Sequence, residues 1–203
     1  MNTLRFWIFV AGYGEMLKVW NQTFGCTGTG IDICSEFISI GKERLEREHI
    51  RGVTLIEHDA LTWGTSEKFD YVCLCGEEFG GFESTINLLQ KYAKPNGKLV
   101  IGTRFSKVDP PPAELSDFEG ETLSLQTING IIRKNHYFIT SVASDTDAEW
   151  ERYIMWSARR HLDNVRNNPN DENGRAWCDK WYDTYFGFRR QFEGYVTLVL
   201  EKE

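Results

Sequence analysis

The chain has 203 residues, of which 41% are hydrophobic and 26% are charged, and this composition is typical of a folded globular protein rather than a disordered one. Its net charge is −7, and no basic stripe is present, which argues against a nucleic-acid partner because phosphate binding needs clustered Lys and Arg. No segment approaches the roughly 18 apolar residues of a membrane span, and no secretory leader is visible. We therefore expect a cytoplasmic protein without a membrane partner.

The cysteines and histidines predict neither disulfides nor a metal site. The cysteines are odd in number and form no C-x-x-C pair, so free, buried thiols in a reducing compartment are expected. The histidines show no paired ligand spacing. These residues are Cys26, Cys34, Cys73, Cys75, Cys178, His49, His58, His136 and His161.

The first segment of the chain predicts a strand, a glycine turn, a helix and a second strand. These elements are expected over Phe6–Val10, Gly12–Gly14, Glu15–Thr23 and Thr29–Ile33. Asp32 lies near the end of the second strand. A glycine turn that leads into a helix, with an acid on the next strand, is typical of a nucleoside-cofactor half-site.

The residues of the turn discriminate between cofactors. A dinucleotide fingerprint has a third glycine, but here Leu17 occupies that position. Glu15 directly follows the turn, where it disfavours a pyrophosphate and suits a ligand with a positive charge, such as the amine and sulfonium of S-adenosylmethionine. An NAD-dependent oxidoreductase is therefore the least favoured of three hypotheses.

Strands and helices continue to alternate along the chain, which predicts a mostly parallel sheet. The first of the later helices carries an apolar stripe of Phe37, Ile40 and Leu45, with Ser35 as its N-cap and a charged run, KERLERE, interpreted as a solvated face. Strands are expected over Val53–His58, Phe69–Cys75, Lys98–Thr103, Tyr137–Ala143 and Gly194–Leu200, and helices over Glu36–Glu48, Glu83–Tyr92 and Thr122–Lys134.

The segment 147–193 separates the last two strands and is rich in aromatic residues. Two helices are expected, over Thr146–Val165 and Glu172–Phe192. In the second, aromatic residues recur at spacings of four, four and three, which places them on one helical face: Trp177, Trp181, Tyr185 and Phe188. This face is either packed core or the lining of a substrate cavity, and an exposed aromatic face would also permit a homodimer.

Together these features resemble the class I S-adenosylmethionine-dependent methyltransferases, and in particular a bacterial group of small-molecule methyltransferase-like proteins. The resemblance rests on the glycine turn, Asp32, the Pro95-Asn96-Gly97 turn, CGEEFGG after the fourth strand, the proline run before Ala113, and EWERYIMWSARRHL. It implies a Rossmann-like α/β fold: a seven-stranded mixed sheet, mostly parallel with strand seven antiparallel, flanked by helices. The chain would form one domain over 1–203, including a helical insert over 147–193.

The resemblance also implies a binding site for S-adenosylmethionine and for a small-molecule methyl acceptor. Asp32 would bind the ribose hydroxyls, although a helix-capping role is the alternative, and Trp63 would either stack on adenine or pack on the helix after Asp32. The other expected cofactor-binding residues are Ala11, Gly12, Tyr13 and Gly14 at the amino-acid and sulfonium end, Ile33, Asp59 and Ala60 around adenine, and Cys75 and Gly76 beside the methyl group. The expected acceptor-binding residues are Phe79, Trp150, Tyr153 and Trp156, and the candidate bases are Glu77 and Glu78, then His136 and His161.

The glycine turn departs from the family pattern at two positions. Members of the family carry D/E-x-G-x-G-x-G, whereas this chain has Ile8 in place of the acid and Val10 in place of the first glycine. A β-branched residue disfavours positive φ. The leading hypothesis is a methyltransferase that acts on a small molecule, and the alternative is a degenerate, non-catalytic relative that binds a nucleoside, a metabolite or a protein.

Overall fold

The structure is a computed structural model that describes residues 3–203. The chain forms two compact units, which are described separately. The first comprises the residues up to Thr103 together with Ile131–Val142 and Thr197–Glu203, and the second comprises Arg104–Gly130 and Ala143–Val196. Strands β5, β6 and β7 and helix α5 contribute residues to both units.

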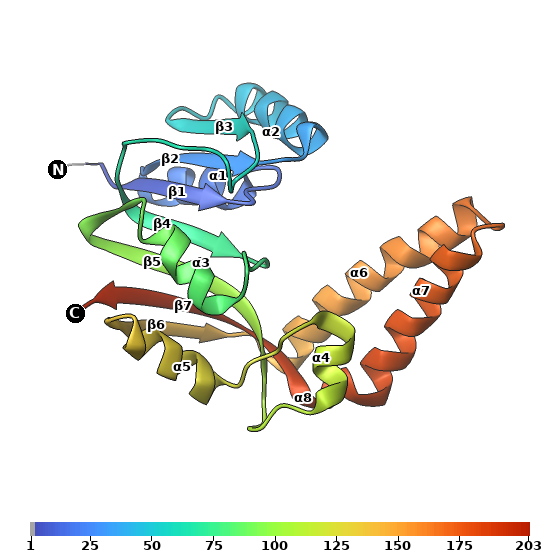
Figure 1. Ribbon diagram of the computed structural model, residues 1–203. Helices are drawn as coiled ribbons and strands as arrows, with labels where there is room; N and C mark the ends of the chain where they lie inside the picture. The colour runs from blue at the N-terminus through green and yellow to red at the C-terminus, as the bar shows by residue number, and fades with distance from the viewer. Residues whose placement is uncertain (1–2) are drawn as a thin grey trace. The chain divides into compact units, whose positions relative to one another are not determined.

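A seven-stranded sheet in the order β3-β2-β1-β4-β5-β7-β6 forms the first unit. Only β7, between β5 and β6, runs against the direction of the other strands (Figure 1). This is the predicted Rossmann-like mixed sheet. The strands are β1 (Arg5–Phe9), β2 (Thr27–Asp32), β3 (Val53–Glu57), β4 (Phe69–Cys75), β5 (Ala93–Ser106), β6 (Tyr137–Ser144) and β7 (Glu193–Lys202).

Strand β1 is buried on both faces, and its alternating side chains belong to two different cores. Phe6 and Ile8 pack in a cluster with residues of α1 (Glu15–Phe24) and α2 (Ser35–Arg47). Trp7 and Phe9 point to the opposite face, where Trp7 stacks on Trp63 at 4.2 Å. Helix α3 (Phe82–Leu89) buries its apolar side chains. Burial on both faces explains why the strand reads as a continuous apolar run.

Helix α2 differs from its prediction in its cap and in its buried face. Cys34, not Ser35, is the N-cap residue, and the buried positions are Ile38, Gly41 and Leu45. The expected stripe residue Ile40 is 42% exposed. A Cβ on Gly41 would lie 2.7 Å from the carbonyl oxygen of Tyr13, so the helix packs against the backbone of the glycine turn through its glycine.

Two further differences occur along the chain. The predicted Pro95-Asn96-Gly97 turn is a bulge within β5, because the pairing with β4 jumps from Phe69↔Ala93 to Tyr71↔Lys98. The prolines are followed by a short helix that the sequence did not predict, α4 (Ala113–Glu119), and α5 (Leu125–Lys134) begins later than expected.

The second unit contains α4 and the helices of the predicted insert (Figure 1). Helix α6 (Asp147–Asn167) begins with a capping box between Thr146 and Glu149, and the turn 168–171 leads into α7 (Glu172–Thr184). The expected single second helix is wrong, because a π-helical segment, η1 (Tyr185–Arg189), and a last turn, α8 (Arg190–Phe192), follow α7. Among the described residues, no helix combines the length and apolar character needed to cross a bilayer.

Aromatic side chains and a buried ion pair form the core of the second unit. Trp150 stacks on Tyr195 at 5.5 Å, and Tyr185 belongs to the same cluster. Arg189 donates from Nε to Oε2 of Glu193 at 2.8 Å, and both side chains are almost fully buried. The predicted stripe divides into two parts: Trp177 and Trp181 contact Phe118 of α4, while Tyr185 and Phe188 line a cavity described below.

Candidate functional site

The turn after β1 adopts left-handed backbone conformations at three positions. Val10, Gly12 and Gly14 have φ of 51°, 54° and 71°. The turn is closed by hydrogen bonds from the N–H of Ala11 to the carbonyl of Ile31 and from the N–H of Gly14 to the carbonyl of Ala11, both 2.9 Å. The turn therefore takes the glycine conformation at Val10 although that residue is β-branched. This conformation costs an L-residue about 1–2 kcal/mol.

Asp32 holds the turn from the end of β2. Its carboxylate is 5% exposed, and Oδ2 accepts a hydrogen bond from the N–H of Gly12 at 2.8 Å. Its Oδ1 accepts from the N–H of Cys34, the residue before α2, at 2.9 Å. Asp32 thus binds the backbone directly before α2 and fixes the glycine turn, but it does not cap the helix, whose N-cap residue is Cys34 and has no side-chain cap bond. Each oxygen keeps a second lone pair that can accept from a ligand hydroxyl.

Ile8 occupies the strand position at which the family carries an acid, and it is 3% exposed within the core. An apolar residue at this position cannot accept hydrogen bonds from the turn. The N–H of Gly12 is instead satisfied by Asp32 on the neighbouring strand. The loss of the strand-one acid therefore leaves the turn anchored.

Arg44 on α2 also contacts the turn, and sequence reasoning missed it because it lies in the charged run KERLERE. Its Nη2 donates to the carbonyl of Tyr13 at 2.7 Å, and its Nη1 pairs with Glu15 at 2.6 Å. The other carboxylate oxygen of Glu15 pairs with Lys18 at 3.1 Å. Glu15, expected to suit a cationic ligand, is therefore engaged by two cations of the protein.

The loops after β2 and β3 present apolar side chains to solvent beside polar groups. Ile33 is 72% exposed and Leu61 is 61% exposed. Asp59 accepts from the N–H of Leu61 at 2.8 Å, and Ala60 is buried. Trp63 is half-buried, stacks on Trp7 and accepts at its carbonyl from the hydroxyl of Tyr92, so it packs on the core around Trp7 rather than on α2.

The loop after β4 contains the two candidate bases in different surroundings. Glu78 is half-buried, and its Oε1 accepts from the Thr103 hydroxyl at 2.7 Å. Glu77 is exposed and makes no hydrogen bond or ion pair with the residues that the structure describes. Phe79 is half-buried, with its N–H donating to Thr85 at 3.0 Å. Burial raises the pKa of the Cys75 thiol, which keeps this thiol neutral.

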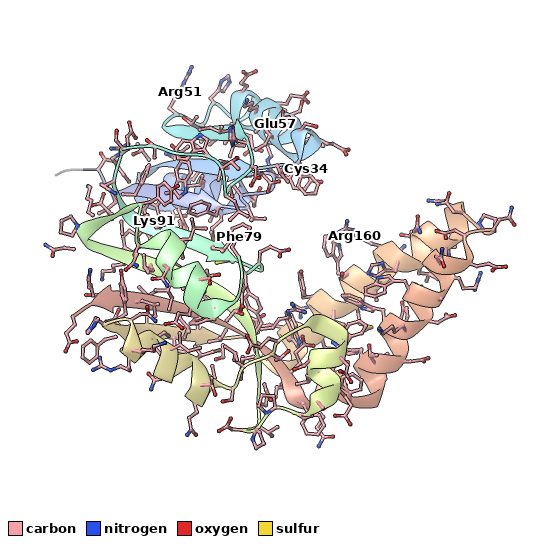
Figure 2. All side chains as sticks on the ribbon, in the orientation of Figure 1. Cys34, Arg51, Glu57, Phe79, Lys91 and Arg160 are labelled. Atoms are coloured by element: carbon pink, nitrogen blue, oxygen red, sulfur yellow. The ribbon has the colours of Figure 1, made fainter. Side chains whose placement is uncertain are left out.

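These loops lie at the same edge of the sheet. Figure 2 labels Cys34 after β2 and Phe79 after β4 at the carboxyl ends of the strands, and Lys91 at the opposite edge. Ligands of open α/β sheets bind at the carboxyl edge, where strand order reverses between β1 and β4. The structure thus brings the turn, Asp32 and the β4 loop together.

The two histidines that were candidate bases lie in different units. His136 is exposed before β6 and pairs with Glu203 at 3.6 Å. His161 lies in the second unit, 4.8 Å from the ring of Trp181. All five cysteines are free, with three buried and Cys34 and Cys75 half-buried. Within residues 3–203, no cluster of three His, Cys, Asp or Glu side chains is arranged to hold a metal ion.

The expected acceptor-binding residues of the insert differ in exposure. Trp150 is 6% exposed, whereas Tyr153 and Trp156 are 54% and 62% exposed. Tyr153 stacks on Trp150 at 5.3 Å, and the guanidinium of Arg160, labelled in Figure 2, lies 5.8 Å from the ring of Trp156.

The residues at the sheet edge fit a nucleoside cofactor with an amino-acid tail. No atom lies within 4 Å of the position of a Cβ on Gly12, so a ligand can approach the backbone there. Asp32 offers free lone pairs to ribose hydroxyls, and the exposed side chain of Ile33 offers an apolar surface to a base.

Comparison with known proteins gives consistent matches. Residues 9–97, from the end of β1 to the β5 bulge, match the model of the methyltransferase domain family. The uncharacterized protein YjhP of Escherichia coli (strain K12) is 31% identical over 172 residues, which are 80% of this chain and 68% of that protein.

Solved structures show the same fold over nearly the whole chain. The crystal structure of YjhP superposes with a TM-score of 0.89 at 26% identity, covering 99% of this chain and 86% of that one. An S-adenosylmethionine-dependent methyltransferase from Thiobacillus denitrificans in complex with S-adenosylhomocysteine superposes with a TM-score of 0.87 at 26% identity, covering 99% of this chain and 86% of that one. Another such methyltransferase, from Geobacter sulfurreducens, superposes with a TM-score of 0.88 at 24% identity, covering 99% of this chain and 85% of that one. These matches place the chain in the class I S-adenosylmethionine-dependent methyltransferase family, whose cofactor is S-adenosylmethionine.

Proposed function

We propose that the chain binds S-adenosylmethionine at the carboxyl edge of its sheet and transfers the methyl group to a small-molecule acceptor. The observation that carries the proposal is the hydrogen bond from the N–H of Gly12 to Asp32, because it forms the cofactor turn although Ile8 and Val10 replace the family residues. S-adenosylmethionine supplies a methyl carbon activated by a sulfonium. The net charge of −7 disfavours a nucleic-acid acceptor.

The protein residues mainly have to position the reactants and exclude water, and such positioning can lower a barrier by about 7–11 kcal/mol. In this proposal the backbone of Gly12 and Tyr13 holds the amino-acid end, Asp32 holds the ribose, and Ile33 and Asp59 contact the base. Glu77, which is exposed and makes no hydrogen bond or ion pair with the described residues, is the proposed general base where the acceptor must lose a proton. Glu78, fixed by Thr103, orients the loop.

Calorimetric titration of S-adenosylmethionine and S-adenosylhomocysteine into the purified protein tests the proposal, with NAD as the control. We expect micromolar binding of both nucleosides, none of NAD, and a loss of at least ten-fold in affinity for Asp32→Ala. If neither nucleoside binds, the proposal is wrong.

A second candidate function is binding without methyl transfer, favoured by the strained backbone of Val10. Turnover of methyl-labelled S-adenosylmethionine against a panel of small acids, amines and phenols separates the two. Label transfer that falls in Glu77→Gln but not in Lys91→Gln, at the opposite edge of the sheet, supports catalysis. Tight nucleoside binding with no transfer to any member of a broad panel favours the binding role.

A further inference from the structure

The second unit contains a cavity of about 420 Å³ that nothing above assigns. Its wall comes from the end of β5, the first turn of α6, and the π-helical segment with α8. All of the lining residues belong to the second unit. The volume falls in the range of small-molecule sites, which is about 300–1,000 Å³.

One side of the cavity is aromatic. Trp150 is 6% exposed and Tyr185 is 1% exposed. Phe186, which is 59% exposed, and Phe188 complete this wall.

The other side of the cavity carries two cations whose donors are only partly used. Lys107 pairs with Asp147 at 2.7 Å, which uses one of its three N–H donors. Arg190 pairs through Nε with Oε2 of Glu151 at 3.0 Å, and Glu151 does not line the cavity. No bond from the terminal nitrogens of Arg190 to a described residue is present. These nitrogens remain available for the bidentate geometry that guanidinium forms with carboxylates.

The wall therefore has more hydrogen-bond donors than acceptors. Its charged donors are the ammonium of Lys107 and the guanidinium of Arg190, and its one carboxylate, Asp147, already accepts from Lys107. Two cations disfavour an amine ligand. The complementary ligand is an anion that carries several acceptors and a flat apolar body to fill the aromatic side.

The backbone around the cavity is also unusual. The π-helical segment Tyr185–Arg189 interrupts the helical path and supplies Tyr185, Phe186 and Phe188 to the wall. Single π-turns within α-helices occur frequently at functional sites, because the wider turn re-aims side chains that a regular helix would place elsewhere.

We propose that this cavity binds a small aromatic carboxylate, with the carboxylate held by Lys107 and Arg190 and the ring packed on Phe186 and Phe188. Binding at this cavity is independent of the methyl transfer proposed above, since every proposed contact comes from the second unit.

A fluorine NMR titration of the full chain tests this, with 4-fluorophenylacetate as the probe. The matched probes 4-fluorophenylacetamide and 4-fluorobenzylamine remove or reverse the charge. We expect the carboxylate to bind at least ten-fold more tightly than either. Equal binding of the amide, preference for the amine, or no binding of the carboxylate overturns the proposal.

Variants locate the site. Lys107→Gln and Arg190→Gln should each lower the affinity for 4-fluorophenylacetate at least five-fold. Arg160 is an exposed cation of α6 outside the cavity, so Arg160→Gln should change this affinity less than two-fold. Asp147→Asn should tighten binding at least two-fold, because it removes a competing carboxylate from Lys107, and misfolding cannot produce that gain. Unchanged affinity in all three cavity variants would overturn the assignment.

One variant keeps this proposal separate from the proposed function. Asp32→Ala should lose S-adenosylhomocysteine binding and retain 4-fluorophenylacetate binding within two-fold. If the wild-type protein binds the carboxylate but not the nucleoside, the cavity proposal stands and the proposed methyltransferase activity fails. Loss of carboxylate binding in Asp32→Ala would place the probe at the nucleoside site and overturn the cavity proposal.

Discussion

The N–H of Gly12 donates a hydrogen bond of 2.8 Å to Oδ2 of Asp32, and the second oxygen of the same carboxylate accepts from the N–H of Cys34 at 2.9 Å. One buried side chain thus connects the turn after β1 with the start of α2. A role in ribose binding and a role in folding coincide in Asp32, so its substitution should affect both.

The first prediction concerns Asp32→Asn. An amide offers one acceptor oxygen, so either Gly12 or Cys34 loses its partner, and the free energy of unfolding should fall by about 1–3 kcal/mol. S-adenosylhomocysteine affinity should fall at least ten-fold. Asp70→Asn is the matched control, because Asp70 accepts from the N–H of Arg5 at 2.9 Å at the opposite end of β1. It should lower stability in urea and leave the affinity unchanged; a similar loss of affinity in both variants would mean that stability alone controls binding.

The second prediction concerns Val10→Gly. Val10 has φ of 51°, and the relief of about 1–2 kcal/mol of strain exceeds the entropy cost of glycine, about 0.5–1 kcal/mol. The free energy of unfolding should therefore rise by up to about 1 kcal/mol. Affinity for S-adenosylhomocysteine should change less than three-fold, because the turn already has its glycine conformation. Val10→Ala, which keeps a Cβ, should raise the free energy of unfolding by less than Val10→Gly does. A ten-fold gain in affinity for Val10→Gly would instead identify a decayed site.

Sequence patterns predicted the sheet well because its strands are buried. The range Phe69–Cys75 of β4 agrees with the structure, and Asp32 was placed at the sheet edge from its position after an apolar run. Sequence patterns did not predict the residues that hold the turn through individual tertiary contacts. Gly41 has no side chain to contribute to an apolar stripe, and Arg44 lies in a run of charges, so neither contact with the turn was visible.

The second unit was predicted less well for a related reason. Helix α4 is seven residues long and packs through Phe118, which stacks on Trp177 at 5.6 Å. A helix this short depends on tertiary packing. The π-helical segment breaks the 3.6-residue period on which the prediction of one continuous helix rested. The sequence offered a cavity lined by this aromatic face and named Trp150 as a binding residue, but it did not predict the π-helical wall.

A third prediction compares two helical glycines. In Gly41→Ala the new methyl group would lie 2.7 Å from the carbonyl of Tyr13 and 2.6 Å from Leu55, so the turn or the helix must shift. Such overpacking costs about 1–3 kcal/mol, and we expect weaker binding of S-adenosylhomocysteine as well. Gly130 on α5 has no atom within 4 Å of a Cβ position, so Gly130→Ala should gain about 0.5–1 kcal/mol and leave binding unchanged. Urea unfolding and calorimetry measure both. Equal changes in stability and affinity for Gly41→Ala and Gly130→Ala would show that the close packing of Gly41 against the turn is not the cause.

The last prediction concerns pH and His161. Burial and, secondarily, the charge of Arg160 lower the pKa of His161 below 6.5, the value expected in the unfolded chain. The unfolded state therefore binds this proton more readily than the folded state. Stability from this group is fully present above pH 6.5 and is lost as the pH falls through the lowered folded pKa. His161→Phe keeps a ring beside Trp181 and removes the proton site, so the fall in unfolding free energy between pH 7.5 and 5 should be smaller in this variant than in the wild type. Identical pH profiles for the wild type and His161→Phe would show that His161 does not contribute.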